Sequence, residues 1–213
     1  MKESTQSKYP SPLVMEPLRV FLRFVTKLFW RIEFHNTENI PQNLEGGLLV
    51  VPNHQSYFDP FWICIPIKRK YRFMAWDKAF EWFLVGDVIR YLGAFPVNLE
   101  RAGKEAFKQA VKALKEGATL MIFPEGAREF SDGKMLEFKS GAVKIAMLAG
   151  VPILPVTIRG GNKVWAQDMK YPRAGKVEIF YHPVMEIPRD ARDKRELIDE
   201  LTDRLEEIIK SKM

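Results

Sequence analysis

The sequence predicts an α/β fold: one domain with a mixed, largely parallel central sheet flanked by helices, plus an N-terminal amphipathic helix. Short apolar runs of strand length alternate with amphipathic segments of helix length, which is the pattern of a sheet covered by helices on both faces. Glycine and proline punctuate the connections. With 213 residues and 46% hydrophobic side chains, the chain is long enough for one sizeable core.

We expect three segments along the chain. Residues 1–14 are polar at first and contain two prolines, so they predict a disordered tail. Residues 15–35 predict an amphipathic helix at a membrane interface, and residues 36–213 predict the α/β domain.

The N-terminal helix combines a cationic stripe with a broad apolar surface. Arg19, Arg23, Lys27 and Arg31 recur every four residues, and apolar side chains fill most of the remaining circumference. Such a helix is typical of segments that lie in a bilayer interface. The alternative is a helix packed on the domain with its basic stripe in solvent.

Within the domain, periodicity and breakers predict the elements in order. A loop is expected over 35–47, where Pro41 and two glycines interrupt the chain. Strands are expected at 48–51, 72–76, 94–97, 119–123, 153–158 and 177–181. Helices are expected at 59–67, 79–91, 102–116, 139–149 and from 190 onward.

Composition limits the classes of partner. The formal charge of +6 and the pI near 9.3 favour anionic partners. Nucleic acid is disfavoured because the positive charge comes with no recognisable motif for reading bases.

The single cysteine, Cys64, excludes an intramolecular disulfide and fits a reducing compartment. We find no secretory signal and no uncharged apolar stretch of about 18 residues, so we expect no membrane span.

The strongest chemical signal is a histidine and a carboxylate five positions apart on a strand-to-helix turn. His54 follows the apolar run at 48–51, and Asp59 precedes Pro60 at an expected helix start. In open α/β sheets, ligands bind at such loops. The carboxylate can hold the proton on one ring nitrogen and leave the other free to act as a base. A plain helix-start role for Asp59 is compatible with that function.

A second polar cluster follows the strand expected at 119–123. It contains Glu125, Gly126 and Arg128, where glycine permits a close ligand approach and the guanidinium recognises phosphate. The alternative is a polar turn with a Glu–Arg ion pair.

Together with these clusters, two further blocks produce a family resemblance. His54 and Asp59 resemble the histidine–x4–aspartate signature of the glycerolipid acyltransferases, the 1-acylglycerol-3-phosphate O-acyltransferase (lysophosphatidate acyltransferase) family. The run Phe123–Arg128 is similar to that family's Phe-Pro-Glu-Gly-Thr-Arg block. Gly93–Val97 resembles its second block and Val151–Val156 its fourth, in the family's order.

The resemblance implies an acyltransferase that moves a fatty acyl group from acyl-CoA or acyl-carrier protein to the free hydroxyl of 1-acylglycerol 3-phosphate, making phosphatidate. His54 would be the general base and Asp59 its orienter, with no acyl-enzyme, no metal and no cofactor. Glu125, Gly126 and Arg128 would bind the acceptor, with Arg128 on its phosphate. A lyso-lipid acceptor also favours a peripheral or monotopic location on the cytoplasmic face of the cell membrane, where the N-terminal helix would contact anionic lipid.

Several positions depart from the family's pattern. Ala127 replaces the usual threonine, and Leu99 stands where the second block has an arginine, with Arg101 two residues later. Trp76 replaces a lysine found in many members, with Lys78 two residues later. Arg101 and Lys78 are therefore included among the expected substrate-binding residues, and the head group of the acceptor stays open.

Lys139 is the last expected substrate-binding residue, because it can add positive charge just before Ser140 and Gly141. Its alternative is a solvated lysine at a helix start. Three other functions also remain open: the same chemistry on another lyso-phospholipid or amino-lipid, a thioesterase or lysophospholipase, and a non-catalytic membrane-surface module.

Overall fold

The computed structural model describes residues 12–69, 71–76, 80–81, 86–87, 90, 94–97, 104–188 and 195–213. Residues 1–11, Lys78, Arg101 and most of the helix expected at 79–91 lie outside the described residues.

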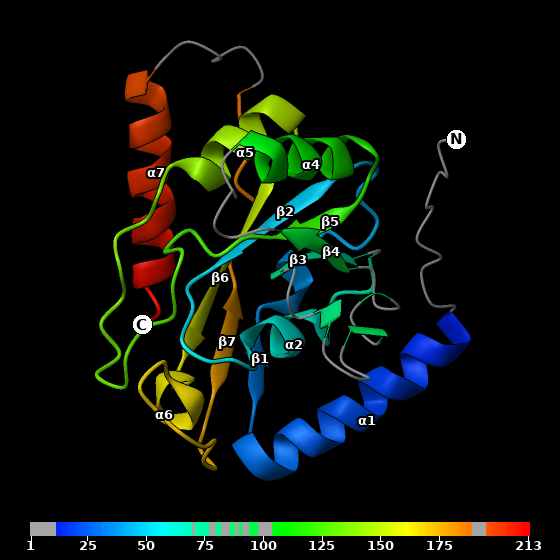
Figure 1. Ribbon diagram of the computed structural model, residues 1–213, viewed down its shortest axis with the longest axis vertical. Coiled ribbons are helices and arrows are strands. Elements are labelled where there is room, and N and C mark those ends of the chain that lie inside the picture. The colour runs from blue at the N-terminus through cyan, green and yellow to red at the C-terminus, as the bar shows by residue number, and fades with distance from the viewer. Residues whose placement is uncertain are drawn as a thin grey trace.

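A seven-stranded sheet forms the centre of the described part (Figure 1). Its spatial order is β1-β7-β6-β2-β5-β3-β4, and every neighbouring pair is parallel except β6 and β7. The expected mixed, largely parallel sheet is therefore confirmed. The strands are β1 (Glu33–His35), β2 (Leu48–Pro52), β3 (Tyr71–Trp76), β4 (Ala94–Val97), β5 (Thr119–Met121), β6 (Ile153–Arg159) and β7 (Glu178–Tyr181).

Helices cover both faces of this sheet (Figure 1). They are α1 (Pro12–Trp30), α2 (Asp59–Cys64), α4 (Lys104–Lys115), α5 (Gly141–Ala149), α6 (Asn162–Trp165) and α7 (Arg195–Lys210), with a 3-10 turn η1 (Thr37–Asn39). The α5 helix ends at Gly150, whose φ of 67° lets its amide bond back to the last carbonyls.

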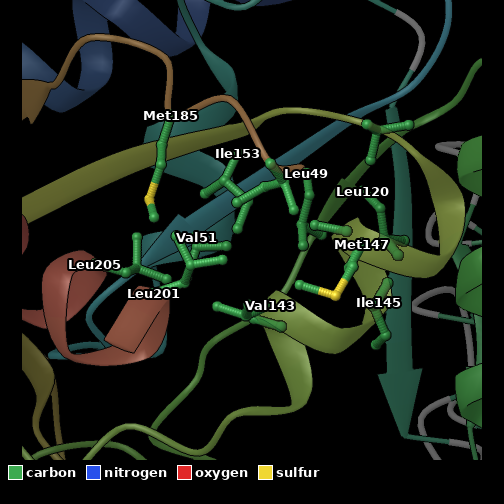
Figure 2. Packing of buried hydrophobic residues seen from close by; sticks show 14 of the residues in the cluster. Leu49, Val51, Leu120, Val143, Ile145, Met147, Ile153, Met185, Leu201 and Leu205 are labelled. Carbon is green, nitrogen blue, oxygen red and sulfur yellow. The ribbon is translucent and has the colours of Figure 1, made fainter. Parts of the chain in front are cut away.

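The central strand β2 is buried along its whole length, and its successive side chains enter two separate cores. Leu49 and Val51 face a core closed by α4, α5 and α7 (Figure 2). Leu48 and Val50 face a second core that contains Trp62 of α2. Burial on both faces explains why the strand reads as a continuous apolar run rather than an alternating one.

The N-terminal boundaries differ from the sequence prediction at both ends. The helix begins at Pro12, so the predicted tail over 1–14 is wrong for its last three residues; proline suits a first turn because it lacks an N–H that would have no partner there. The helix ends at Trp30, before Arg31 adopts a φ of 43°.

The residues that follow this helix belong to the sheet. Glu33–His35 forms β1, which pairs with β7, so the predicted helix over 15–35 is too long and the α/β domain begins before residue 36. Edge pairing and the packing of Ile32 and Phe34 in the second core outweigh the helical pattern. No helix in the described part is long and apolar enough to cross a membrane.

Candidate active site

Three neighbouring strands deliver the polar loops of the candidate site to one edge of the sheet. β2 lies between β5 and β6 and runs parallel to both, so the carboxyl ends of all three strands meet at that edge. His54 follows β2, Glu125 follows β5 and Gly161 follows β6. Ligands of open α/β sheets bind in this position.

The predicted histidine–carboxylate pair is formed. His54 Nδ1 lies 2.9 Å from Asp59 Oδ2 across the turn that begins α2. Asp59 is fully buried, whereas the His54 side chain keeps 14% of its exposure. The carboxylate accepts the Nδ1 proton, which leaves Nε2 as the basic nitrogen.

The Asp59 carboxylate organises its own loop as well. Its Oδ2 also accepts the backbone N–H groups of Gln55 and Ser56, each at 2.7 Å. Burial raises the pKa of Asp59, while the His54 hydrogen bond and these two amides oppose that rise. Oδ1 is buried without a hydrogen-bond partner in the described part, close to Gly161, where an added Cβ would sit 3.3 Å from it.

Glu125 braces the His54 segment from the neighbouring strand. Its Oε1 accepts the backbone N–H of His54 at 2.7 Å, and its Oε2 accepts that of Leu136 at 2.8 Å. Burial, with added repulsion from Glu129 and Asp59, raises the pKa of Glu125 to about 8 against the lowering effect of both amides. The carboxyl group therefore holds the backbone of His54, and its binding to substrate stays a prediction.

Glu129 was not predicted, and it holds the same segment from the loop that also carries Glu125. Its carboxylate accepts the side-chain amides of Asn53 at 3.2 Å and Gln55 at 2.9 Å, and its own N–H donates to the His54 carbonyl at 2.7 Å. Glu129 is fully buried, and burial is the main cause that raises its pKa to about 7.

Asn53 and Gln55 extend this network to β6. The Asn53 side chain donates to the carbonyl of Ile158 and accepts its N–H, at 3.0 and 2.7 Å. Gln55 Oε1 accepts the Gly161 amide at 2.9 Å. These contacts hold the residues on both sides of His54 against β6. Every buried polar group of the network other than Asp59 Oδ1 therefore has a partner.

An aromatic ring covers one face of the His54 imidazole. The Phe123 ring stacks on the His54 imidazole with centroids 3.8 Å apart and an interplanar angle of 20°. The stack limits rotation of the imidazole, which the bond to Asp59 also restrains.

Two of the predicted basic residues, Arg128 and Lys139, lie in the described part of the chain. The Arg128 guanidinium lies 3.6 Å from the centroid of the exposed Tyr57 ring, and no ion pair in the described part joins it to Glu125. Gly126 has a φ of 74°, and a Cβ there would meet Lys139 Nζ at 2.7 Å. Arg128 thus contacts the His54–Asp59 turn through Tyr57, and Lys139 approaches Gly126. The binding of substrate by these three residues stays a prediction.

Comparisons with known proteins identify the family of this chain. The sequence model of the acyltransferase family matches residues 31–159, which is more than half of the chain and includes every site loop described above except Gly161. The chain belongs to the acyltransferase family. The family prediction made from four sequence blocks is thereby confirmed.

Individual relatives place the chain close to the 1-acyl-sn-glycerol-3-phosphate acyltransferases. The enzyme of that name from Streptococcus pneumoniae is 37% identical over 142 residues, which are 64% of this chain and 52% of the relative. The chloroplast enzyme of that name from Arabidopsis thaliana is 29% identical over 167 residues, 73% of this chain and 46% of the relative. This chain thus spans about half the length of these curated relatives.

A solved structure shows the same fold. The crystal structure of the 1-acyl-sn-glycerophosphate acyltransferase PlsC from Thermotoga maritima aligns with a TM-score of 0.76 and 33% identity. The alignment covers 93% of this chain and 77% of that chain.

Proposed function

We propose that this acyltransferase moves a fatty acyl group from an acyl thioester to the free hydroxyl of 1-acylglycerol 3-phosphate, making phosphatidate. The observation that carries the proposal is the 2.9 Å contact between His54 Nδ1 and Asp59 Oδ2 in a chain of the acyltransferase family. The names of its relatives supply the acceptor, and acylation of the free hydroxyl of that acceptor gives phosphatidate.

The geometry supports general-base transfer. His54 Nε2 takes the proton of the acceptor hydroxyl, and the oxygen forms a bond to the thioester carbonyl carbon. The tetrahedral intermediate collapses as the carbon–sulfur bond breaks, and the His54 imidazolium returns the proton to the thiolate. Asp59 stabilises the imidazolium that exists between these steps, because its carboxylate faces Nδ1.

The side chains near the base favour direct transfer over an acyl-enzyme. Ser56 is fully buried, and its hydroxyl oxygen accepts the backbone N–H of Phe58. The Cys64 thiol donates to the carbonyl of Pro60, and burial raises its pKa, which keeps it protonated. Neither group is placed as an activated nucleophile.

The basic residues would hold the phosphate of the acceptor. Arg128 and Lys139 project from the loops that follow β5, and both are at least partly exposed. We include Lys78 and Arg101 in the same role, although they lie outside the described residues. Acyl-CoA and acyl-carrier protein both remain donors in the proposal, and no cofactor or metal takes part in it.

The acceptor resides in a membrane leaflet, and α1 suits contact with that surface. Six large apolar side chains of α1 are more than half exposed: Leu13, Val20, Phe21, Phe24, Leu28 and Phe29. Arg19 binds the carbonyl of Ile67 and so holds α1 on the domain, while Lys27 stays exposed beside the apolar face. An exposed apolar face flanked by cations is the pattern of an interfacial helix.

The test measures thiol release from palmitoyl-CoA by the purified chain in mixed micelles, with and without lysophosphatidate. We expect release only when lysophosphatidate is present, together with equal formation of phosphatidate. Release of free fatty acid without acceptor would show a thioesterase and contradict the proposal. Release that needs a different lyso-lipid would keep the transfer chemistry and reject the proposed acceptor.

A further inference from the structure

A cationic pocket lies outside the proposed site, between α6 and the loop that follows it. Its volume is about 480 Å³, and its lining includes Lys163, Lys170 and Arg173. In the described part of the chain, no carboxylate forms an ion pair with any of these three side chains. The Asp168 carboxylate also lines the pocket, but it accepts the N–H and the hydroxyl of Ser131.

This pocket adjoins the C-terminal end of α1. The Trp30 indole N–H, from the last residue of α1, donates to the backbone carbonyl of Arg173 at 3.1 Å. Figure 1 accordingly shows α1 and α6 at one end of the molecule, with α4 and α5 at the other. The pocket therefore opens beside the helix whose apolar face is exposed.

The rim of the pocket has the chemistry of a membrane interface. Tyr171 is 68% exposed, and Lys170 Nζ lies 5.2 Å from the centroid of its ring. Tyrosine is favoured where an apolar surface meets water, because its ring prefers the apolar side and its hydroxyl the wet side. Lysine and arginine beside it attract anionic head groups.

We propose that the pocket of Lys163, Lys170 and Arg173 binds the phosphate of an anionic phospholipid of the leaflet, as a second membrane contact beside α1. This proposal rests on the membrane role of α1 proposed above. A single amphipathic helix leaves the domain free to roll about the helix axis. A second contact, tied to α1 through Trp30 and Arg173, fixes which side of the domain faces the bilayer.

Fixing that orientation matters for the active site. The Tyr57 ring, which carries the Arg128 guanidinium on one side, also contacts Trp165 of α6 with centroids 4.7 Å apart. The Tyr57 N–H donates to the carbonyl of Trp165 at 3.3 Å. A lipid held at the pocket would thus place the loop of His54 at a defined position relative to the leaflet.

The test is flotation of the full chain with vesicles of phosphatidylcholine alone and of phosphatidylcholine mixed with phosphatidylglycerol. The pocket variant Lys163→Ala/Lys170→Ala/Arg173→Ala is compared with Lys108→Ala/Lys115→Ala/Lys144→Ala, which removes the same charge from exposed lysines of α4 and α5. We expect the pocket variant to bind the mixed vesicles roughly a hundredfold more weakly, about fivefold for each cation. The control variant should stay within about twofold, since its lysines lie at the other end of the molecule.

The remaining outcomes each overturn the proposal. Equal loss in both variants would show unspecific charge, and no loss in the pocket variant would show that the pocket does not touch lipid. Free CoA that binds the wild type and not the pocket variant, measured by calorimetry, would assign the pocket to the acyl donor. Turnover in mixed micelles tests the proposed reaction separately from the lipid pocket, because a micelle assay needs no oriented contact with a bilayer.

Discussion

At the scale of single residues, His54, the proposed base, is held through its backbone as much as through its ring. The His54 N–H donates to Glu125 and its carbonyl accepts from the N–H of Glu129, both at 2.7 Å. The ring is fixed separately, by Asp59 at Nδ1 and by the stack on Phe123. Such support keeps a general base within the narrow range of positions where proton transfer is efficient.

The contact between Glu129 and Gln55 predicts a pair of variants that rescue each other. Glu129→Gln puts an amide donor against the amide of Asn53 or Gln55, and Gln55→Glu puts two carboxyl groups together. Each single variant leaves a buried mismatch that costs about 1–3 kcal/mol of stability. The mismatch should also displace the His54 segment, so we expect kcat to fall about tenfold or more. The double variant restores every donor–acceptor match, including the bond to the Gly161 amide, and should return kcat to within about threefold.

The measurement is kcat, KM for lysophosphatidate and Tm of all four proteins. If Glu129 positions His54, kcat should be low in both single variants and recover in the double variant, while KM changes little. A purely structural role predicts lower Tm in both single variants with unchanged kcat in the folded fraction, and that result would remove Glu129 from the account.

The raised pKa of Glu125 predicts a pH dependence of stability. Its pKa is 4.5 without the fold and about 8 within it, so the unfolded chain holds fewer protons between these values. The stability that this group contributes is full below about 4.5 and is lost as the pH rises through about 8. Tm of the wild type should therefore fall over this range.

Glu125→Gln is the matched variant, because it cannot ionise. At low pH the variant should be less stable than the wild type, because its side-chain NH2 faces the backbone N–H of His54 or Leu136. Its Tm should depend less on pH. The Tm difference between wild type and variant should narrow as the pH rises. A difference that stays constant would contradict the pKa assignment.

At the scale of elements, the turn after β6 must come close to the loop of Asp59. A Cβ at Gly161 would lie 3.0 Å from Gln55 Cβ and 3.3 Å from Asp59 Oδ1. Gly161→Ala should therefore displace Asp59 from His54 and lower kcat about tenfold or more. Gly141→Ala at the start of α5 is the control, because nothing lies within 4 Å of its Cβ, and it should keep kcat. Equal kcat in both variants would show that catalysis does not need the close approach of Gly161 to Asp59.

The elements also show which structural features a sequence can reveal. The strands at 48–51 and 94–97 and the helix over 139–149 were predicted within two residues, because their apolar runs are bounded by glycine or polar breakers. β1 and α6 were missed, since three or four residues carry no periodic signal and their positions depend on pairing or packing with distant segments.

The same limit applies within the site. His54 and Asp59 were found because their spacing at a strand end has chemical meaning, and the structure joins them. Glu129 was missed because its partners, Asn53 and Gln55, lie more than seventy residues away, a relation that no local pattern encodes. A buried acid directly after Arg128, in a loop, would be recognised only from that three-dimensional contact.

At the scale of the whole molecule, the order of the strands makes the site. β2 stands between β5 and β6, which brings together loops that begin at residues 53, 122 and 160. The helices α1 and α6 lie at one end of the molecule and α4 and α5 at the other (Figure 1). The proposed membrane contacts lie at the end of α1 and α6. The proposed function therefore uses one edge of the sheet for chemistry and one end of the molecule for membrane contact.

The central claim is that His54, oriented by Asp59, is the base that activates the acceptor. The most direct test is the rate of phosphatidate formation at saturating palmitoyl-CoA and lysophosphatidate for wild type, His54→Ala and Asp59→Asn. We predict that His54→Ala lowers kcat by about a hundredfold to ten-thousandfold with an unchanged fold, and that Asp59→Asn also lowers kcat because the ring loses its orienting carboxylate. A His54→Ala protein with the kcat of the wild type would contradict the account.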